Sequence, residues 1–416
     1  MRLLSRMLHR LVRRGTLHVI DADGRRHKFR GEPPAPQVTI RLHDRRLHRL
    51  IPLMPDPVMG NAYVDGRLTV EEGTLADFMR LVTLNEEGVT QGPWLGFQEI
   101  ARRLGRPLHQ LNTRRLARIH VASHYDRPKD FYELFLDADL QYSCAYFADH
   151  IETLEEAQEA KKRHIAAKLR LKPGQRVLDI GCGWGGLSLW LAKKFAVEVT
   201  GITLSTEQHA VATARARDAG MSGRVSFELR DYREVRGPFD RLVSVGMLEH
   251  VGAWNYPDFF RHVHDLLARD GIALVHSIGR KGSPTTTSAW VRKRIFPGSY
   301  IPALSEVFAA VERQRLWVTD VEVLRLHYAE TLKAWRERFL VARPRIIQMY
   351  GEAFCRMWEL YLTASEMAFR DGGQMVFQMQ LSRDIAAVPL TRDYQFDAER
   401  VLAAQGAATE RAHGVA

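Results

Sequence analysis

The stretch VLDIGCGWGG at residues 177–186 constrains the fold more than any other part of the chain. Its apolar start predicts a buried strand, and Gly181 and Gly183 let the backbone turn tightly and approach a ligand. Residues 186–195 then have the pattern of a helix, whose first N–H groups would face that ligand. A glycine turn is weak evidence when it stands alone, because a tight packing turn has the same residues.

The segments around this turn alternate between strand and helix patterns. Such alternation predicts an α/β domain with a parallel sheet and right-handed crossovers. An insertion at about 281–315 interrupts the alternation beside the expected active site. The predicted strands are 176–181, 197–204, 225–231, 239–246, 271–279, 317–326 and 374–381, and the predicted helices include 186–195, 205–220 and 256–267.

The order of residues in the glycine motif narrows the range of ligands that the turn could bind. Asp179 precedes the turn, and the pattern is D-x-G-x-G-x-G and not the dinucleotide-binding G-x-G-x-x-G. This pattern is typical of class I S-adenosylmethionine methyltransferases. A generic member has an acidic residue after the second strand for the ribose, whereas this chain has Thr203 and Gln208 there.

Several longer motifs then resemble one family, the cyclopropane-fatty-acyl-phospholipid synthases, with their relatives the mycolic acid cyclopropane synthases. The resemblance implies a Rossmann-like, mostly parallel seven-stranded sheet in a catalytic domain at 114–416. The matching stretches are HYDRPKDFYELFLDADLQYSCAYF, VLDIGCGWGG, GITLSTEQ, SVGMLEHVG, LVHSIG, IFPGSYIP and HYAETLKAWRERF, in family order from His124 to Phe339.

Residues 1–113 are predicted to form a smaller α+β domain and linker, which resembles the lipid-binding domain of the phospholipid-type members. The turn DADG between TLHVI and RHKF predicts a hairpin, and LADFMRLVTL predicts a short helix. The first 14 residues place leucines on one helical face and arginines on the other. This pattern is typical of a helix in a membrane interface, or of a helix docked on its own domain with a basic outer face.

The charge balance favours an anionic partner. The net charge is +11 and the isoelectric point about 9.7, which suits nucleic acid, an anionic membrane surface or an acidic substrate. The motifs favour the phospholipid membrane and not nucleic acid, with the protein cytoplasmic and peripheral on the inner face. Three scattered cysteines without CxxC spacing favour a reducing compartment, and analogy suggests a homodimer.

The resemblance implies transfer of a methylene unit from S-adenosylmethionine to a cis double bond of a phospholipid acyl chain, forming a cyclopropane ring. Family members hold a bicarbonate ion as the base for the proton that must leave. Carried over motif by motif, its ligands are Cys144, Glu249, His276, the backbone of Ile278, and Tyr328. Cys144 is thus interpreted as a hydrogen-bonding residue that lines an anion site, and not as a covalent nucleophile.

The cofactor contacts are predicted from the same motifs. Tyr142 and Ser143 precede Cys144, and the pair Tyr232 and Arg233 falls where the adenine is held. The full predicted set is Tyr142, Ser143, Asp179, Gly181, Gly183, Thr203, Leu204, Gln208, Tyr232 and Arg233.

Each of these residues has a plainer interpretation. Cys144 could be a buried structural cysteine, Glu249 an acid that stabilises a helix N-terminus, and His276 a core histidine within a strand. His120 and His124 have helical spacing but no suitable third ligand, so no metal site is predicted.

One departure from the family and two rival functions complete the prediction. Many members have a late cysteine where LTASEMAF places Ser365, and Cys355 is too distant in sequence to replace it. The first rival is a sister enzyme that leaves a methyl or methylene branch without closing a ring. The other is a non-enzymatic lipid-binding protein.

Overall fold

The computed structural model describes residues 1–86, 127–148, 151 and 153–413, and it divides the chain into two compact units. The first unit contains residues 1–109, 285–297 and 332–374, and the second contains 110–284, 298–331 and 375–416. The first unit therefore includes two segments that the sequence analysis assigned to the catalytic domain. None of the helices in the described residues is long and apolar enough to cross a membrane.

The first unit is built on a four-stranded sheet with the order β2-β1-β3-β4. The DADG turn joins β1 and β2 as the predicted antiparallel hairpin. Within this unit, α4 contacts β3 and α16, and α3 contacts α13 and α16. The elements are α1 (Arg2–Leu11), β1 (Arg14–Ile20), β2 (Arg26–Arg30), β3 (Glu32–Leu42), α2 (Leu47–Leu53), α3 (Pro55–Val64), β4 (Leu68–Glu72), α4 (Leu75–Leu84), α13 (Ala289–Arg294), α16 (Glu352–Arg370) and the part of α15 (His327–Tyr350) after Thr331.

Two features of the first unit follow directly from its sequence. Thr74 and Asp77 form a capping box that starts α4 at the predicted residue. The proline-rich stretch 32–36, whose composition would favour a break between strands, is instead the beginning of β3. The β1–β3 register shifts between Arg14 and Thr16, so this stretch lies opposite a bulge. A bulge leaves residues without ladder hydrogen bonds, which is where a strand tolerates proline.

The second unit contains the seven-stranded sheet, with the order β10-β11-β9-β8-β5-β6-β7. Strands β5 to β9 pair in parallel, and β10 pairs with β11 in the antiparallel sense. The predicted class I methyltransferase architecture is thereby confirmed. The main elements are α8 (Lys129–Tyr132), α9 (Leu154–Leu169), β5 (Arg176–Ile180), α10 (Gly186–Phe195), β6 (Glu198–Thr203), α11 (Thr206–Asp218), β7 (Val225–Leu229), β8 (Phe239–Val245), α12 (Tyr256–Leu266), β9 (Leu267–Arg280), α14 (Leu304–Glu312), β10 (Trp317–Val323), β11 (Gln374–Ser382) and α17 (Asp393–His413).

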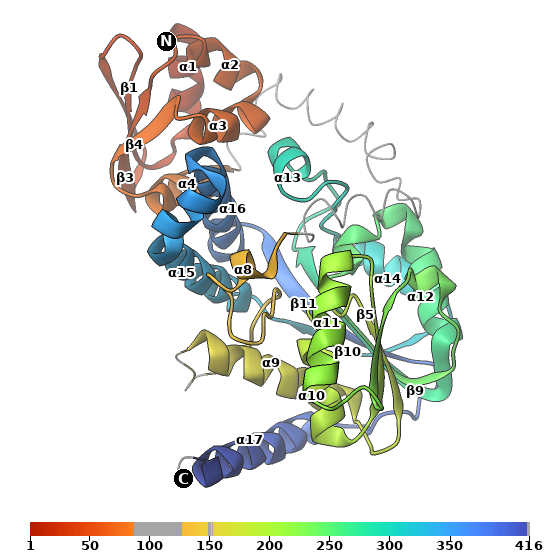
Figure 1. Cartoon of the computed structure of the whole chain (residues 1–416). Coiled ribbons are helices and arrows are strands. Elements are labelled where there is room, and N and C mark those ends of the chain that lie inside the picture. The colour runs from red at the N-terminus through yellow and green to blue at the C-terminus, as the bar shows by residue number, and fades with distance from the viewer. Residues whose placement is uncertain (87–126, 149–150, 152, 414–416) are drawn as a thin grey trace. The chain divides into compact units, whose positions relative to one another are not determined.

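Each face of this sheet has its own apolar core. Alternate strand residues point to opposite faces, so Leu242 packs in the cluster beneath α12 and α14, and Val243 packs in the cluster beneath α9 and α10. Figure 1 shows α12 and α14 on one side of the strands and α10 and α11 on the other. The two cores fix the carboxyl ends of the parallel strands at one edge, where α/β sheets bind their ligands.

Candidate active site

All predicted catalytic and cofactor residues lie in the second unit. The glycine turn leaves the carboxyl end of β5, and Gly181 and Gly183 have φ angles of +84° and +54°. A Cβ atom on Gly183 would meet nothing within 4 Å. Only glycine adopts this conformation readily, and the empty space beside it gives a ligand room to approach the backbone.

Asp179 is buried and accepts a hydrogen bond from the Ser188 hydroxyl at 2.7 Å. Burial raises the pKa of its carboxyl group to about 6. This contact joins the end of β5 to α10 and holds the glycine turn between them. The assignment of Asp179 to cofactor binding stays a prediction.

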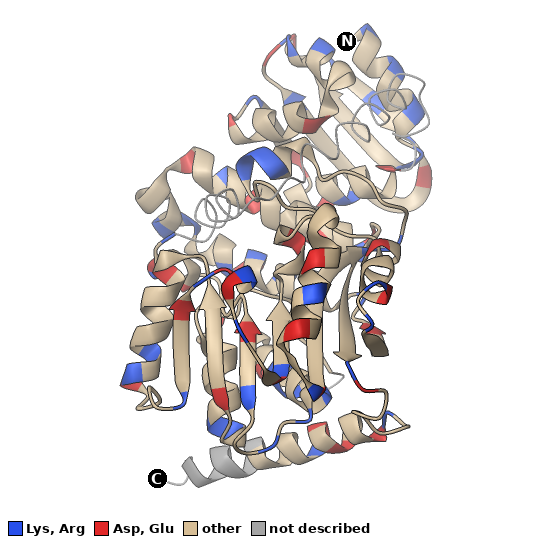
Figure 2. Cartoon of the chain, turned by 90° about the vertical axis from the view of Figure 1, so that its right-hand side faces the viewer, with Lys and Arg blue, Asp and Glu red and all other residues tan. Residues whose placement is uncertain are grey.

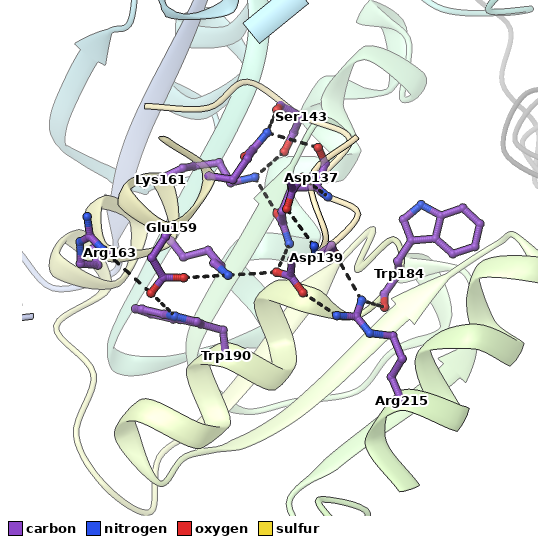
Figure 3. A network of polar contacts seen from close by, with 12 residues as sticks. Asp137, Asp139, Ser143, Glu159, Lys161, Arg163, Trp184, Trp190 and Arg215 are labelled. Atoms are coloured by element: carbon purple, nitrogen blue, oxygen red, sulfur yellow. Dashed lines mark hydrogen bonds and ion pairs between the residues drawn. The ribbon is translucent and has the colours of Figure 1, made fainter. Parts of the chain in front are cut away.

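Residues 137–144, which we call the strap segment, are held beside the glycine turn by charged groups. The Arg215 guanidinium forms an ion pair with Asp139 at 2.5 Å and donates to the Trp184 carbonyl at 2.7 Å. Lys162 adds a second ion pair to Asp139, at 3.0 Å. Figure 3 shows Arg215 on α11 pointing toward Asp139 of the strap segment.

Lys161 is the innermost member of this network. Its ammonium group donates to the Gln141 side-chain oxygen at 2.6 Å and to the Ser143 hydroxyl at 2.9 Å (Figure 3). The side chain is 1% exposed, and burial lowers its pKa to about 8. Burial raises the pKa of the neighbouring Asp137 carboxyl, although the charge of Lys161 opposes that shift. Sequence reasoning missed Lys161, which positions the predicted cofactor contact Ser143.

Three predicted cofactor residues lie at or just after the end of the second parallel strand. Thr203 is the last residue of β6, and Ser205 caps α11 by accepting the Gln208 N–H at 3.2 Å. The Thr203 hydroxyl donates to the Gln208 side-chain oxygen at 3.2 Å, and both side chains are buried. Leu204 lies half-buried between them in the sequence. Neutral hydrogen-bonding groups therefore occupy this position, and their assignment to cofactor binding stays a prediction.

Tyr232 and Arg233 lie just after β7, in a short 3-10 helix. The Tyr232 ring is buried and packs edge-on against Phe259, with ring centroids 5.3 Å apart. Arg233 forms a two-pronged ion pair with the buried Asp231, at 2.8 and 2.6 Å. Sequence reasoning did not single out Asp231, which fixes Arg233. Assignment of the predicted pair to the adenine stays a prediction.

The structure brings two of the predicted base-site groups into contact. One Glu249 carboxyl oxygen accepts the Ile278 N–H at 2.6 Å. The other oxygen is buried and makes no hydrogen bond of good geometry within the described residues, although the Ser277 side chain is close enough to oppose the effect of burial on the pKa of this carboxyl group. Burial raises the pKa of this carboxyl group to about 7. An unpaired buried carboxyl oxygen is costly, so a water molecule or another hydrogen-bonding group is expected beside it.

His276 precedes Ile278 by two residues on β9 and is 3% exposed. Burial, together with the positive charges of Lys161 and Lys168, lowers the pKa of its imidazole to about 3. The ring is therefore neutral at physiological pH and has one N–H donor and one acceptor. Neutral His276 can therefore donate and accept hydrogen bonds, whereas the Glu249 carboxyl, with its pKa near 7, can gain or lose a proton near neutral pH.

Cys144 and Tyr328 come from distant parts of the sequence. Cys144 is buried, its thiol donates to the Ala145 carbonyl at 3.2 Å, and burial raises its pKa. A thiol in this state is a poor nucleophile. The Ala145 N–H donates to the Thr331 hydroxyl at 3.0 Å, which joins the strap segment to the first turns of α15, where the buried Tyr328 lies. Convergence of all five groups on one anion stays a prediction.

The comparisons with known proteins are consistent with this geometry. Residues 112–379 match the sequence profile of the mycolic acid cyclopropane synthetase family. The chain belongs to the mycolic acid cyclopropane synthetase family. With its fold, this membership makes the chain an S-adenosylmethionine-dependent methyltransferase, as predicted.

Individual members of the mycolic acid cyclopropane synthetase family are similar over most of the chain. The Escherichia coli K12 protein named cyclopropane-fatty-acyl-phospholipid synthase is 41% identical over 289 residues, which are 70% of this chain and 74% of that protein. A probable fatty acid methyltransferase of Pseudomonas putida is 35% identical over 82% of this chain and 85% of its own length. The structure of mycolic acid cyclopropane synthase CmaA1 complexed with SAH and CTAB has a TM-score of 0.60 at 32% identity, and covers 65% of this chain and 99% of that chain.

Two predictions fall outside this site. His120 and His124 lie outside the described residues, and within the described residues no three His, Cys, Asp or Glu side chains gather as a metal site requires. Ser365 is half-buried on α16, which belongs to the first unit, whereas the predicted base-site residues belong to the second.

We expect the half-buried residue at this position to be a packing residue. Ser365→Ala should leave turnover unchanged, and Ser365→Cys should not increase it. Turnover with saturating S-adenosylmethionine and lipid is the measurement. A large gain on restoring the cysteine would show that this chain has lost a catalytic group.

Proposed function

We propose that the protein transfers a methylene unit from S-adenosylmethionine to the cis double bond of a phospholipid-bound fatty acyl chain, forming a cyclopropane ring. The names of its relatives support S-adenosylmethionine-dependent modification of fatty acyl chains. The observation that carries the finer proposal is the buried, unpaired oxygen of Glu249. The other oxygen of this carboxyl group accepts the N–H of Ile278, which follows the neutral, buried His276 by two residues on β9.

The reaction explains why such a site is needed. The double bond attacks the sulfonium methyl carbon with its π electrons, and S-adenosylhomocysteine leaves with the sulfur lone pair. The new C–C bond leaves a carbocation on the neighbouring carbon. Loss of a proton from the added methyl group provides the electron pair that closes the ring. A dry site with one base allows this step and keeps water from trapping the cation.

The residues fit a bicarbonate ion as that base. Bicarbonate has one O–H donor and several acceptor oxygens, and would take up the proton released at ring closure. Glu249 can accept from its O–H through the unpaired oxygen. The N–H of the neutral His276 ring can donate to another oxygen. The thiol of Cys144 and the hydroxyl of Tyr328 are further candidate donors.

Lipid analysis of a host that expresses the protein tests this proposal. We expect unsaturated phospholipid acyl chains to gain one CH2 unit, and the product to lack a double bond. A parallel culture expressing Glu249→Gln is the matched control, since its fold and cofactor site should be intact. Unchanged acyl chains in the presence of soluble, cofactor-binding protein would contradict the proposal.

A branching methyltransferase is the second candidate function. The similarity to a probable fatty acid methyltransferase of Pseudomonas putida supports it. In that reaction the same carbocation would lose a different proton or receive a hydride from a reductant. The unpaired Glu249 oxygen favours ring closure, because it offers a hydrogen-bond acceptor for an anion that could serve as the base.

We also propose that the first unit attaches the protein to an anionic phospholipid surface, on the cytoplasmic face of the membrane. Helices α1 and α2 contact each other and contain no acidic residue. Figure 2 shows mainly positive residues on the helices next to the N-terminus. The apolar face of α1 is partly covered, since Leu4 is buried, whereas Leu3 is 49% exposed. Leu50 and Leu53 on α2 and the adjacent Met54 are also exposed.

Exposed apolar residues beside arginines are typical of a helix that lies in a lipid interface. An arginine near an anionic surface contributes on the order of 1 kcal/mol. Replacing Arg6, Arg10, Arg13 and Arg14 by glutamine should therefore strongly weaken co-sedimentation with vesicles containing anionic lipid. High salt should weaken binding of the parent protein in the same way.

A charge-matched variant shows whether vesicle binding depends on where the positive charges lie or only on the net charge. Arg217, Arg224, Arg261 and Arg400 are exposed residues of the second unit. Replacing them by glutamine also removes four charges from +11, which leaves +7. We expect this control to sediment like the parent protein, and both variants to bind S-adenosylhomocysteine normally. Equal sedimentation of the α1 variant and the parent at low salt would show that docking occurs elsewhere.

A further inference from the structure

A chain of buried hydrogen bonds lies behind His276. The Gln378 side chain on β11 contacts the His276 ring, with 3.1 Å between Nε2 of the amide and Nδ1 of the imidazole. The amide oxygen of the same glutamine accepts from the Lys168 ammonium at 2.7 Å. Both Gln378 and Lys168 are 1% exposed, so water does not compete for these contacts.

These contacts determine which ring nitrogen of His276 carries the proton. An ammonium group can only donate, so the oxygen of the Gln378 amide must face Lys168. The amide NH2 then faces His276 and donates to Nδ1. Because burial and nearby positive charges keep the ring neutral, its single proton is on Nε2. His276 therefore offers a fixed N–H donor at Nε2.

Lys168 is itself fixed by a charged cluster. Its ammonium group forms a short ion pair with Glu322, whose carboxylate also contacts His164 Nε2 at 2.7 Å. His164 Nδ1 contacts Glu399 on α17 at 2.5 Å, and its ring stacks on Tyr146 at 4.1 Å. Burial would raise the pKa of Glu322, but its contacts with His164 and Lys168 outweigh burial and lower the pKa to about 2. Glu322 is therefore ionised and holds the Lys168 ammonium group in place, although burial lowers the pKa of that ammonium group.

We propose that Gln378 and Lys168 are positioning residues that hold His276 as the Nε2–H tautomer. The fixed donor would then orient the anion at the base site before the proton leaves the added methyl group. The identity of the anion that accepts this hydrogen bond from His276 rests on the proposed function. The tautomer itself follows from the contacts of Gln378.

The replacement Gln378→Glu tests the proposal most sharply. A carboxylate can accept from Lys168 but cannot donate to His276, so the ring proton should move to Nδ1. Nε2 would then be an acceptor and could no longer donate to the anion. We expect turnover to fall by roughly 10²-fold, as for loss of one preorganised donor. The affinity for S-adenosylhomocysteine should stay unchanged, because Gln378 contacts none of the predicted cofactor residues in the described hydrogen bonds.

The chain provides a matched control two residues further along β11. Gln380 is also 1% exposed, and its amide donates to the Lys168 carbonyl at 2.6 Å. Its hydrogen bonds do not lead to the His276 ring. Gln380→Met should therefore lower the stability of the protein about as much as Gln378→Met does, because both replace a buried glutamine of β11. It should keep the parent tautomer of His276 and the parent turnover. Gln378→Met is the second test variant, and it should give a mixture of both tautomers.

The measurements are the ring-nitrogen NMR signals of His276 in histidine-labelled protein, turnover, and calorimetry with S-adenosylhomocysteine. A tautomer switch in Gln378→Glu with reduced turnover supports the proposal. An unchanged tautomer in both Gln378 variants would overturn it. A switch without a change in turnover would show that the Nε2 donor is not used. If the parent protein modifies no lipid, the proposed function fails, and the tautomer signals still report whether Gln378 sets the ring proton.

Discussion

Glu249→Gln should bind S-adenosylmethionine like the parent protein but turn over acyl chains roughly 10²-fold or more slowly, as expected for loss of one preorganised electrostatic group. The amide keeps an oxygen that can accept the Ile278 N–H, which the carboxyl accepts at 2.6 Å. It cannot, however, become the anionic acceptor that the buried, unpaired oxygen provides. Calorimetry and turnover on the same sample separate the two effects, and parental turnover would contradict the assignment.

The pH dependence of activity tests the role of Glu249 independently. The Glu249 carboxyl has its pKa raised to about 7 by burial, so it is neutral below that pH and ionised above it. If the ionised form is the active one, kcat/KM of the parent should rise as the pH increases through about 7. The residual activity of Glu249→Gln should not show this rise with pH.

The stability of Glu249→Gln provides its folding control. Between the ordinary pKa of 4.5 and about 7, the folded protein binds more protons at Glu249 than the unfolded chain does. The free energy of unfolding should therefore decrease as pH rises through this range. The variant has no such loss, so at pH 8 it should unfold at no lower temperature than the parent. A marked drop would mean that lost activity reports misfolding.

Lys161→Met should lower both stability and cofactor affinity. The buried ammonium group donates to Gln141 and Ser143, and its charge favours ionisation of the buried Asp137 carboxyl. Removing one partner from a buried charged cluster costs about 3 kcal/mol. Without Lys161 the strap segment loses its inner attachment, so S-adenosylhomocysteine should bind at least about tenfold more weakly, the equivalent of 1.4 kcal/mol.

Arg163→Met is the matched control for this replacement. Arg163 lies two positions further along α9 and faces Glu159 at 4.0 Å, with 19% of its side chain exposed. A partly exposed pair of this kind contributes at most about 1 kcal/mol. Chemical denaturation and calorimetry should therefore show a small effect for Arg163→Met. If Lys161→Met behaves in the same way, the strap segment does not depend on its buried lysine.

The sheet of the second unit could be predicted because its signals are local. A buried strand, a glycine turn and a helix follow one another at 177–186, and Ser205 begins α11 where its capping role predicts. The predicted last strands at 317–326 and 374–381 are β10 and β11. Strong periodicity and turn residues in the sequence itself carry this information.

The polar network behind the site could not be predicted in this way. Helix α9 contains lysines and glutamates at spacings typical of a solvated helix, yet Lys161 and Lys168 are buried. They are buried because their partners come from other elements: Lys168 pairs with Glu322, 154 positions away. No local pattern encodes such a pairing. The segments 285–297 and 332–374 lie in the first unit for a similar reason, since long-range packing and not local sequence places them there.

Deuterium counting tests the central claim, ring closure with loss of a proton from the transferred methyl group. The protein is incubated with S-adenosylmethionine that carries a fully deuterated methyl group and with vesicles of cis-unsaturated phospholipid. We predict acyl products that retain two of the three deuterons and show no olefinic signal by NMR. Retention of all three deuterons would indicate a methyl branch, and two deuterons with an olefinic signal would indicate a methylene branch. Either result would contradict cyclopropane formation.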